Sequence, residues 1–181
     1  MLKDSYDKIL WSLLAVTLVA LVVVFLGHRA AGGNAKGLAG PDKALEREMA
    51  YQARVEFINR LYAPVDALRR AGDPQGALFK LDELVRLYPN EAHGRILQGE
   101  ILYGMGTLDE AVVRYVEGVR LNGDYVDRKS PLSRRSGIQK VADEGLKVIG
   151  ARSRANPGNR SMAESLKNVN YLRSRLAGGC E

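Results

Sequence analysis

The residues of this chain that could do chemistry are two acidic pairs, two histidines and one cysteine. The acidic pairs are Asp109-Glu110 and Asp143-Glu144. Neighbouring carboxylates can serve as general acid and base when their surroundings push their pKa values apart. Both pairs instead fall in segments with helical periodicity, where carboxylates commonly cap a helix or face solvent. We therefore interpret them as structural residues and predict that the chain is not an enzyme.

The histidines and the cysteine do not form a recognisable site. His28 and His93 are far apart in sequence, and Cys180 is the only cysteine. One cysteine excludes an intramolecular disulfide, a CxxC redox pair and a CxxCH haem attachment, and it leaves too few ligands for a typical zinc site. The sequence also lacks a glycine-rich phosphate loop, an HExxH motif and a nucleophile elbow. We predict no metal, no cofactor and no small-molecule substrate.

Residues 9–27 form an uncharged, strongly apolar run near the N-terminus of the chain. As a helix this run would be about 28 Å long, which is close to the hydrocarbon thickness of a bilayer. Tyr6 and Trp11 lie near one end, where aromatic rings favour the membrane interface. The run predicts a transmembrane helix, preceded by a short tail at residues 1–8.

Two other interpretations of the run remain open, a cleaved signal peptide and a buried helix of a soluble domain. The flanking Lys and Arg residues do not decide the orientation. A short tail before a long apolar run is the usual layout of an uncleaved signal anchor, whose following domain is exported. We therefore expect a single-pass protein of a bacterial inner (cytoplasmic) membrane with a periplasmic C-terminal domain.

Residues 28–41 contain four glycines and predict a flexible linker, so the folded domain should span residues 42–181. Asp42 can cap a helix that starts near Lys43, because apolar residues then recur every four positions. Pro64 should kink or interrupt this helix, since proline removes a backbone donor.

The remainder of the chain follows a fixed period. Residues recur at intervals of 34 positions in four sets: Gly72 and Gly106; Ala77, Ala111 and Gly145; Leu81, Tyr115 and Ile149; and Pro89, Gly123 and Pro157. Asp73-Pro74 can cap and begin a helix. Thr107 and Ser161 each precede a glutamate by three residues, the spacing of a capping box. The pattern predicts stacked helix-turn-helix units.

This pattern resembles the tetratricopeptide repeat (TPR) family, whose unit has 34 residues. Residues 92–125 match best, through Gly99, Leu102, Gly106, Leu108, Ala111, Tyr115 and Gly118. Arg95, Gln98 and Gly123 depart from the tryptophan, leucine and proline that the family often has there. Residues 58–91 match less well, because Pro64 replaces a typical leucine. Residues 126–159 are a degenerate unit, in which Lys140 replaces the turn glycine.

The resemblance implies an all-α fold. The N-terminal transmembrane helix would be followed by a helical-repeat solenoid with a C-terminal capping helix at residues 160–177. The alternative is a plain helical bundle whose spacings coincide. In the family, the first helices of successive units line a concave groove that binds other proteins. The corresponding residues here are Asn59, Tyr62, Asp66, Arg69, His93, Ile96, Glu100, Tyr103, Asp127 and Arg134.

Positive charge is concentrated toward the C-terminus. Residues 126–177 hold 12 Lys and Arg against 4 Asp and Glu. The predicted basic patch comprises Arg128, Lys129, Arg134, Arg135, Lys140, Arg152 and Arg154. Such a patch could meet acidic protein or anionic lipid headgroups, or simply be solvated. Nucleic acid is not expected, because aromatic residues are sparse there.

Two functions fit these features best. The first is a membrane-anchored scaffold, a non-catalytic subunit or assembly factor of a membrane or envelope complex. Its partners would be other proteins, and the N-terminal helix would contact membrane lipid. The second is a periplasmic chaperone-like adaptor, resembling membrane-anchored repeat proteins of cytochrome c maturation or of the translocon. An enzyme with an unrecognised site is the third possibility.

Overall fold

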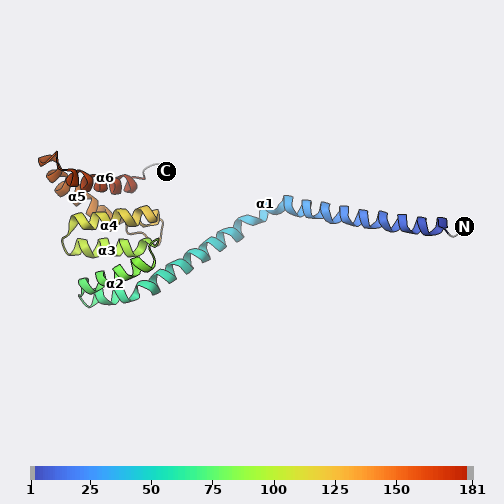
Figure 1. Ribbon diagram of the computed structural model, residues 1–181, viewed down its shortest axis with the longest axis horizontal. Helices are drawn as coiled ribbons and strands as arrows, with labels where there is room; N and C mark the ends of the chain where they lie inside the picture. The colour runs from blue at the N-terminus through green and yellow to red at the C-terminus, as the bar shows by residue number, and fades with distance from the viewer. Residues whose placement is uncertain (1–2, 179–181) are drawn as a thin grey trace. The chain divides into compact units, whose positions relative to one another are not determined.

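The computed structural model describes the backbone of residues 3–178 and, from residue 45 onward, nearly every side chain. Within these residues the chain is all-α, and no strand is present. The helices are α1 (Lys3–Arg70), α2 (Pro74–Leu87), α3 (Ala92–Gly104), α4 (Leu108–Leu121), the short 3₁₀ helix η1 (Gly123–Tyr125), α5 (Arg135–Ala155) and α6 (Arg160–Leu176) (Figure 1). The chain divides into a first unit that ends at Ala53 and a second that starts at Arg54.

The first unit consists of the N-terminal part of α1. This helix runs through residues 28–41, where the sequence predicts a linker, although each glycine disfavours helix by about 1 kcal/mol relative to alanine. The described side chains of the apolar run, which include Trp11 and Leu21, are exposed. Among the residues that could be searched, no helix meets the length and hydropathy that crossing a membrane requires. Most side chains of residues 9–27 lie outside the described residues, so the transmembrane helix stays a prediction.

The second unit begins with the end of α1, which packs into the core. Ile58, Tyr62 and Val65 are buried on its inner face. Pro64 does not interrupt the helix, contrary to that part of the prediction. The proline is exposed, so water can reach the carbonyl that loses its partner. The helix ends at Arg70.

The two glycine turns that the period predicts are confirmed. Gly72 and Gly106 have φ angles of +77° and +83°, a region that disfavours side chains with a Cβ. After the first turn, Asp73 caps α2 by accepting a hydrogen bond from the Gly76 amide at 2.8 Å, with Pro74 as the first helical residue. The sequence therefore located both turns and one cap correctly.

Both predicted capping boxes are wrong. Thr107 is the N-cap of α4, but its hydroxyl donates to the Leu102 carbonyl at 3.0 Å and accepts no cap hydrogen bond. Helix α6 is capped by Asn159, whose side chain accepts from the Met162 amide, so Ser161 lies inside the helix. In the first case the Thr107 hydroxyl is used in another local hydrogen bond, and in the second a residue earlier in the chain supplies the cap.

The third predicted repeat unit also differs from a helix-turn-helix pair. Residues 135–155 form the single helix α5, which passes through Lys140 without a turn. Its hairpin partner is α6, the predicted capping helix, which packs on both α5 and α4. The spacing nevertheless identified buried positions, because Gly145 and Ile149 both lie in the core of this hairpin.

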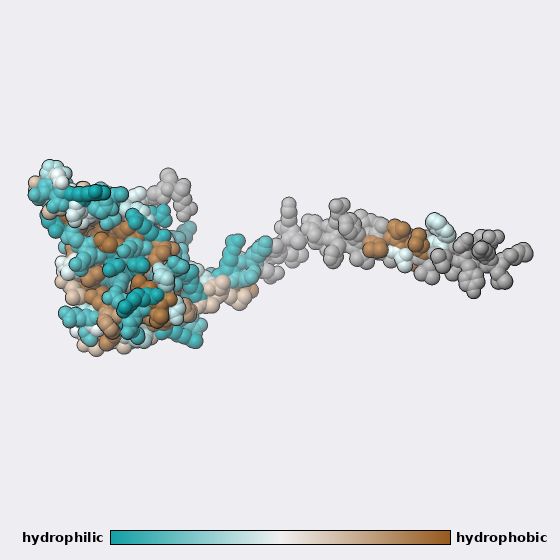
Figure 2. Space-filling view, in the orientation of Figure 1, coloured by the Kyte–Doolittle hydropathy of each residue, from teal (hydrophilic) through white to brown (hydrophobic). Residues whose placement is uncertain are grey.

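Pairs of small and large residues hold the helices together. A Cβ at Gly99 would lie 2.9 Å from the Tyr115 ring, and one at Gly118 would lie 2.6 Å from the Ile96 side chain. Real Cβ atoms essentially never approach that closely, so only glycine permits these contacts. The resulting core runs from the end of α1 to α6, beneath a surface on which hydrophilic and hydrophobic residues are interspersed (Figure 2).

Candidate partner groove

Four of the ten predicted groove residues line one hollow of about 400 Å³ in the second unit. They are Arg69 at the end of α1, Glu100 and Tyr103 on α3, and Arg134 just before α5. Tyr115, Ser133, Ser136 and Gly137 complete the lining. The hollow therefore collects side chains from several helices, as a groove along successive first helices would.

Glu100 is the centre of an ion-pair chain across this hollow. One carboxylate oxygen lies 3.1 Å from an Arg69 guanidinium nitrogen, and the other lies 3.3 Å from Arg134 Nε. Arg69 also pairs with Asp66 at 3.6 Å. Glu100 is only partly exposed, with 21% of its side chain open to solvent. These ion pairs connect α1, α3 and the start of α5 through the carboxylate of Glu100.

Tyr103 makes a second cross-helix contact beside the hollow. Its hydroxyl donates to Glu144 at 2.5 Å, and Lys140 Nζ lies 5.4 Å from the centre of its ring. The hydrogen bond to Glu144 raises the pKa of Tyr103. Lys140, predicted as part of a basic patch, therefore lies against an aromatic ring instead.

Three predicted groove residues belong to the core. Tyr62, His93 and Ile96 are 1%, 6% and 0% exposed, so they cannot contact a partner. Helix α3 packs against both α2 and α4 and meets Tyr62 of α1, which leaves little of its circumference free. The repeat register identified the correct helix, but the surrounding helices cover the face that carries these residues.

His93 lies in a buried aromatic cluster. Its Nδ1 is 2.9 Å from the Tyr125 hydroxyl oxygen, and its ring centre is 4.8 Å from that of Tyr62. Burial, followed by the positive charges of Arg134 and Arg69, lowers the pKa of His93 to about 4. The ring is therefore neutral near pH 7, and its role is structural packing.

Two further predicted groove residues are exposed but lie elsewhere. Asn59 is on the outer part of α1 and lines no described hollow. Asp127 is in the loop after η1, where its carboxylate accepts a hydrogen bond from the Lys129 amide at 2.9 Å. The loop forms because η1 replaces the start of the third unit's first helix, so the register no longer applies.

The predicted basic patch does not form one surface. Arg152 pairs with Asp109 at 2.6 Å, and Arg135 donates to two backbone carbonyls. Arg134 belongs to the groove, whereas Arg154 is exposed on α5. Arg128 and Lys129 line a different hollow. The prediction counted charges correctly but could not see which of them are paired.

The acidic pairs also separate into different environments. Asp109 binds Arg152 and Glu144 binds Tyr103, while Glu110 and Asp143 are exposed. Within the described part of the chain, no group of three or more His, Cys, Asp or Glu side chains is arranged to hold a metal ion. The arrangement around Glu100 is suited to binding charged groups of a partner, since it presents guanidinium, carboxylate and hydroxyl groups on one surface.

Sequence reasoning missed the serines of the groove. Ser133 and Ser136 line the hollow beside Arg134, with Gly137 next to them. Their position just before or at the start of α5 depends on where that helix begins, which the degenerate unit did not reveal. A comparison with protein-family models found no matching family, and a comparison with curated proteins found no matching sequence.

Proposed function

We propose that this chain is a non-catalytic, membrane-anchored TPR-like scaffold that binds a segment of a partner protein in the hollow around Glu100. The single observation that carries this function is the convergence of Arg69, Glu100, Tyr103 and Arg134 on one surface. These side chains come from helices far apart in sequence, and they offer polar groups without any nucleophile–base pair. An extended peptide or a partner helix recognised by charged and hydroxyl groups fits such a surface.

The contacts between α3 and α4 support the repeat architecture. Gly99 lies against Tyr115, a small and an aromatic position that the resemblance assigns, and Gly118, its second small position, lies against Ile96. Arg95 and Gln98, which depart from the family pattern, form polar contacts between helices instead, with Glu117 at 2.6 Å and Asp82 at 2.7 Å. At these two positions, polar contacts between helices therefore take the place of the apolar contacts typical of the family.

The apolar run at residues 9–27 supports membrane anchoring. Thr17 lies within this run, and its hydroxyl donates to the Leu14 carbonyl at 2.9 Å. A bilayer offers no water to a polar side chain, so a hydroxyl that binds its own helix is suited to that environment. The proposed location is a bacterial inner membrane, with the second unit in the periplasm as part of a membrane complex.

Site-specific photo-crosslinking in native membranes tests the function. A photoreactive amino acid replaces Ser136, which lines the hollow and is exposed, and a matched control replaces Ala151, which is exposed elsewhere on α5. The scaffold requires one or a few partners crosslinked from position 136 in fixed proportion, and none of these from position 151. A varied set of exported proteins from position 136 would favour the chaperone-like adaptor. Equal labelling from both positions would contradict a groove at Glu100.

A further inference from the structure

The Lys and Arg side chains of the second unit are partnered unevenly along the sequence. Every Lys and Arg between residues 54 and 125 has an ion-pair, hydrogen-bond or ring partner. Of the 12 Lys and Arg at residues 126–177, four have such partners, namely Arg134, Arg135, Lys140 and Arg152. Among the described residues the side chains of the others are unpaired: Arg128, Lys129, Lys147, Arg154, Arg160, Lys167, Arg173 and Arg175.

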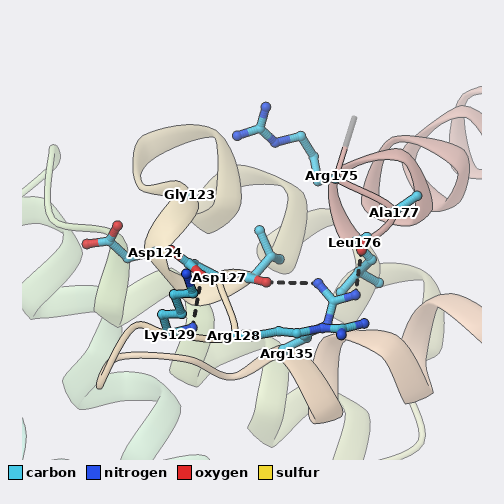
Figure 3. A pocket seen from close by; sticks show the side chains of 11 residues that line it. Gly123, Asp124, Asp127, Arg128, Lys129, Arg135, Arg175, Leu176 and Ala177 are labelled. Carbon is cyan, nitrogen blue, oxygen red and sulfur yellow. Dashed lines mark hydrogen bonds between the residues drawn. The ribbon is translucent and has the colours of Figure 1, made fainter. Parts of the chain in front are cut away.

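Three of these unpaired cations line one hollow. Arg128 and Lys129 come from the loop after η1, and Arg175 comes from the last turn of α6 (Figure 3). The hollow has a volume of about 790 Å³, enough for a small organic anion. Two of these three unpaired cations, Arg128 and Arg175, carry guanidinium groups, whose planar fork matches the oxygens of a phosphate. Three unpaired positive charges therefore line a hollow that a ligand could enter.

Arg135 fixes the wall of this hollow. Its guanidinium donates to the Val126 carbonyl at 2.9 Å and to the Leu176 carbonyl, joining the loop to the end of α6 (Figure 3). The bond to Leu176 satisfies one carbonyl at the helix C-terminus, which would otherwise repel an anion. The wall is thus held in place by a residue that keeps its positive charge.

The Arg175 side chain extends toward Gly123, which also lines the hollow. One of its terminal nitrogens lies 3.1 Å from where a Cβ at Gly123 would be, so glycine leaves room for the guanidinium. Its Nε is buried and has no hydrogen-bond partner among the described residues. A buried donor without a partner costs free energy, and a shift of the guanidinium toward a ligand oxygen would recover it.

The hollow also contains two carboxylates, which limit its positive charge. Asp127 accepts from the Lys129 amide at 2.9 Å, and Asp124 lies 3.4 Å from the Asn122 amide nitrogen. The Asp124 carboxylate points away from the arginines in Figure 3. The four Lys and Arg residues of the lining exceed the two carboxylates by two charges, which a doubly charged anion would neutralise.

We propose that this hollow binds a phosphate group, held by Arg128, Lys129 and Arg175. Hydrogen bonds between cations and phosphate oxygens are among the stronger ones in proteins, and these three cations line the same hollow. The phosphate can be a free ion or the headgroup of an anionic lipid, and both present the same oxygens. The site is separate from the hollow around Glu100 and does not depend on the function proposed for it.

Calorimetric titration of the full-length chain in a maltoside detergent tests the site. The probes are inorganic phosphate and a short-chain phosphatidylglycerol, with a short-chain phosphatidylcholine for comparison. The variant Arg128→Gln/Lys129→Gln removes two exposed cations of the hollow, and Lys147→Gln/Lys167→Gln removes two exposed cations outside it. We expect the first variant to weaken binding about tenfold or more and the control variant to leave it within about twofold.

Comparison of the probes identifies the source of the phosphate. Saturable binding of inorganic phosphate that needs Arg128 and Lys129 indicates a free-ion site. Binding of phosphatidylglycerol alone, with the same dependence, indicates a lipid headgroup. Equal weakening in both variants would show diffuse attraction to a basic surface and overturn the proposal, as would the absence of binding by either phosphate probe.

Discussion

At the scale of single residues, His93 is a neutral base held in the core. Its ring is 6% exposed and lies between Tyr62 and Tyr125. Its ring lies 2.9 Å from one polar partner, the Tyr125 hydroxyl, and the charged groups that act on it are the guanidiniums of Arg134 and Arg69, which disfavour a charged ring. Protonation must therefore break a packed arrangement that joins α1, α3 and η1.

Stability should fall as the pH drops from about 6.5 to about 4. Burial lowers the pKa of His93 to about 4 in the folded chain, whereas in the unfolded chain it is near 6.5. The unfolded chain binds more protons in this interval, so acid favours unfolding, by about 3 kcal/mol in all. Urea denaturation followed by circular dichroism measures this loss. The variant His93→Gln should lose distinctly less stability over the same interval; an equally steep loss would assign the effect to other groups.

Substitution of Gln98 by leucine should stabilise the fold. Its amide donates to Asp82 at 2.7 Å, but its carbonyl oxygen is buried without a hydrogen-bond partner among the described residues. Gln98→Leu removes that unsatisfied oxygen and should raise the free energy of unfolding by about 1 kcal/mol. Chemical denaturation gives the value, and Gln98→Ala, which leaves a cavity, should lower it. Destabilisation by leucine as large as that by alanine would show that the bond to Asp82 dominates.

At the scale of helices, glycines set how closely α3 and α4 approach. Gly118→Ala would place a Cβ 2.6 Å from Ile96 Cδ1 and 3.3 Å from its backbone nitrogen, so the buried Ile96 side chain or the helices must shift. We expect a loss of about 1–3 kcal/mol in unfolding free energy. Gly104→Ala is the matched control, because nothing lies within 4 Å of its Cβ and alanine favours helix. Thermal unfolding of both variants measures the two losses. An equal loss of stability at the two positions would contradict this packing.

The helices themselves were predictable where local chemistry dictates them. The glycines at positions 72 and 106 and the Asp73-Pro74 start are local signals, and the structure confirms them. The cap at Thr107 failed because a hydroxyl can also donate backward to a carbonyl, which sequence spacing does not reveal. Of the predicted groove residues, Glu100 and Arg134 do lie together, as an ion pair at 3.3 Å. The repeat register does not show that α3 is enclosed around His93.

At the scale of the whole molecule, the end of α1 belongs to the second unit. Ile58, Tyr62 and Val65 pack into its core, and Arg69 completes the hollow around Glu100. Arg54 adds a further tie, an ion pair with Glu91 at 3.5 Å. The helix that carries the predicted anchor therefore also contributes to the partner groove.

A fragment of residues 54–181 should fold without detergent, because it contains every buried side chain described for the core. A fragment of residues 71–181 lacks Ile58, Tyr62 and Val65 and exposes the His93 cluster to water. Each lost apolar side chain is worth about 1.5–3 kcal/mol, which approaches the stability of a small domain. Thermal unfolding followed by circular dichroism should therefore give one cooperative transition for the longer fragment and none for the shorter. Transitions at the same temperature for both fragments would mean that α1 is dispensable, and the groove at Arg69 would then have no fixed wall.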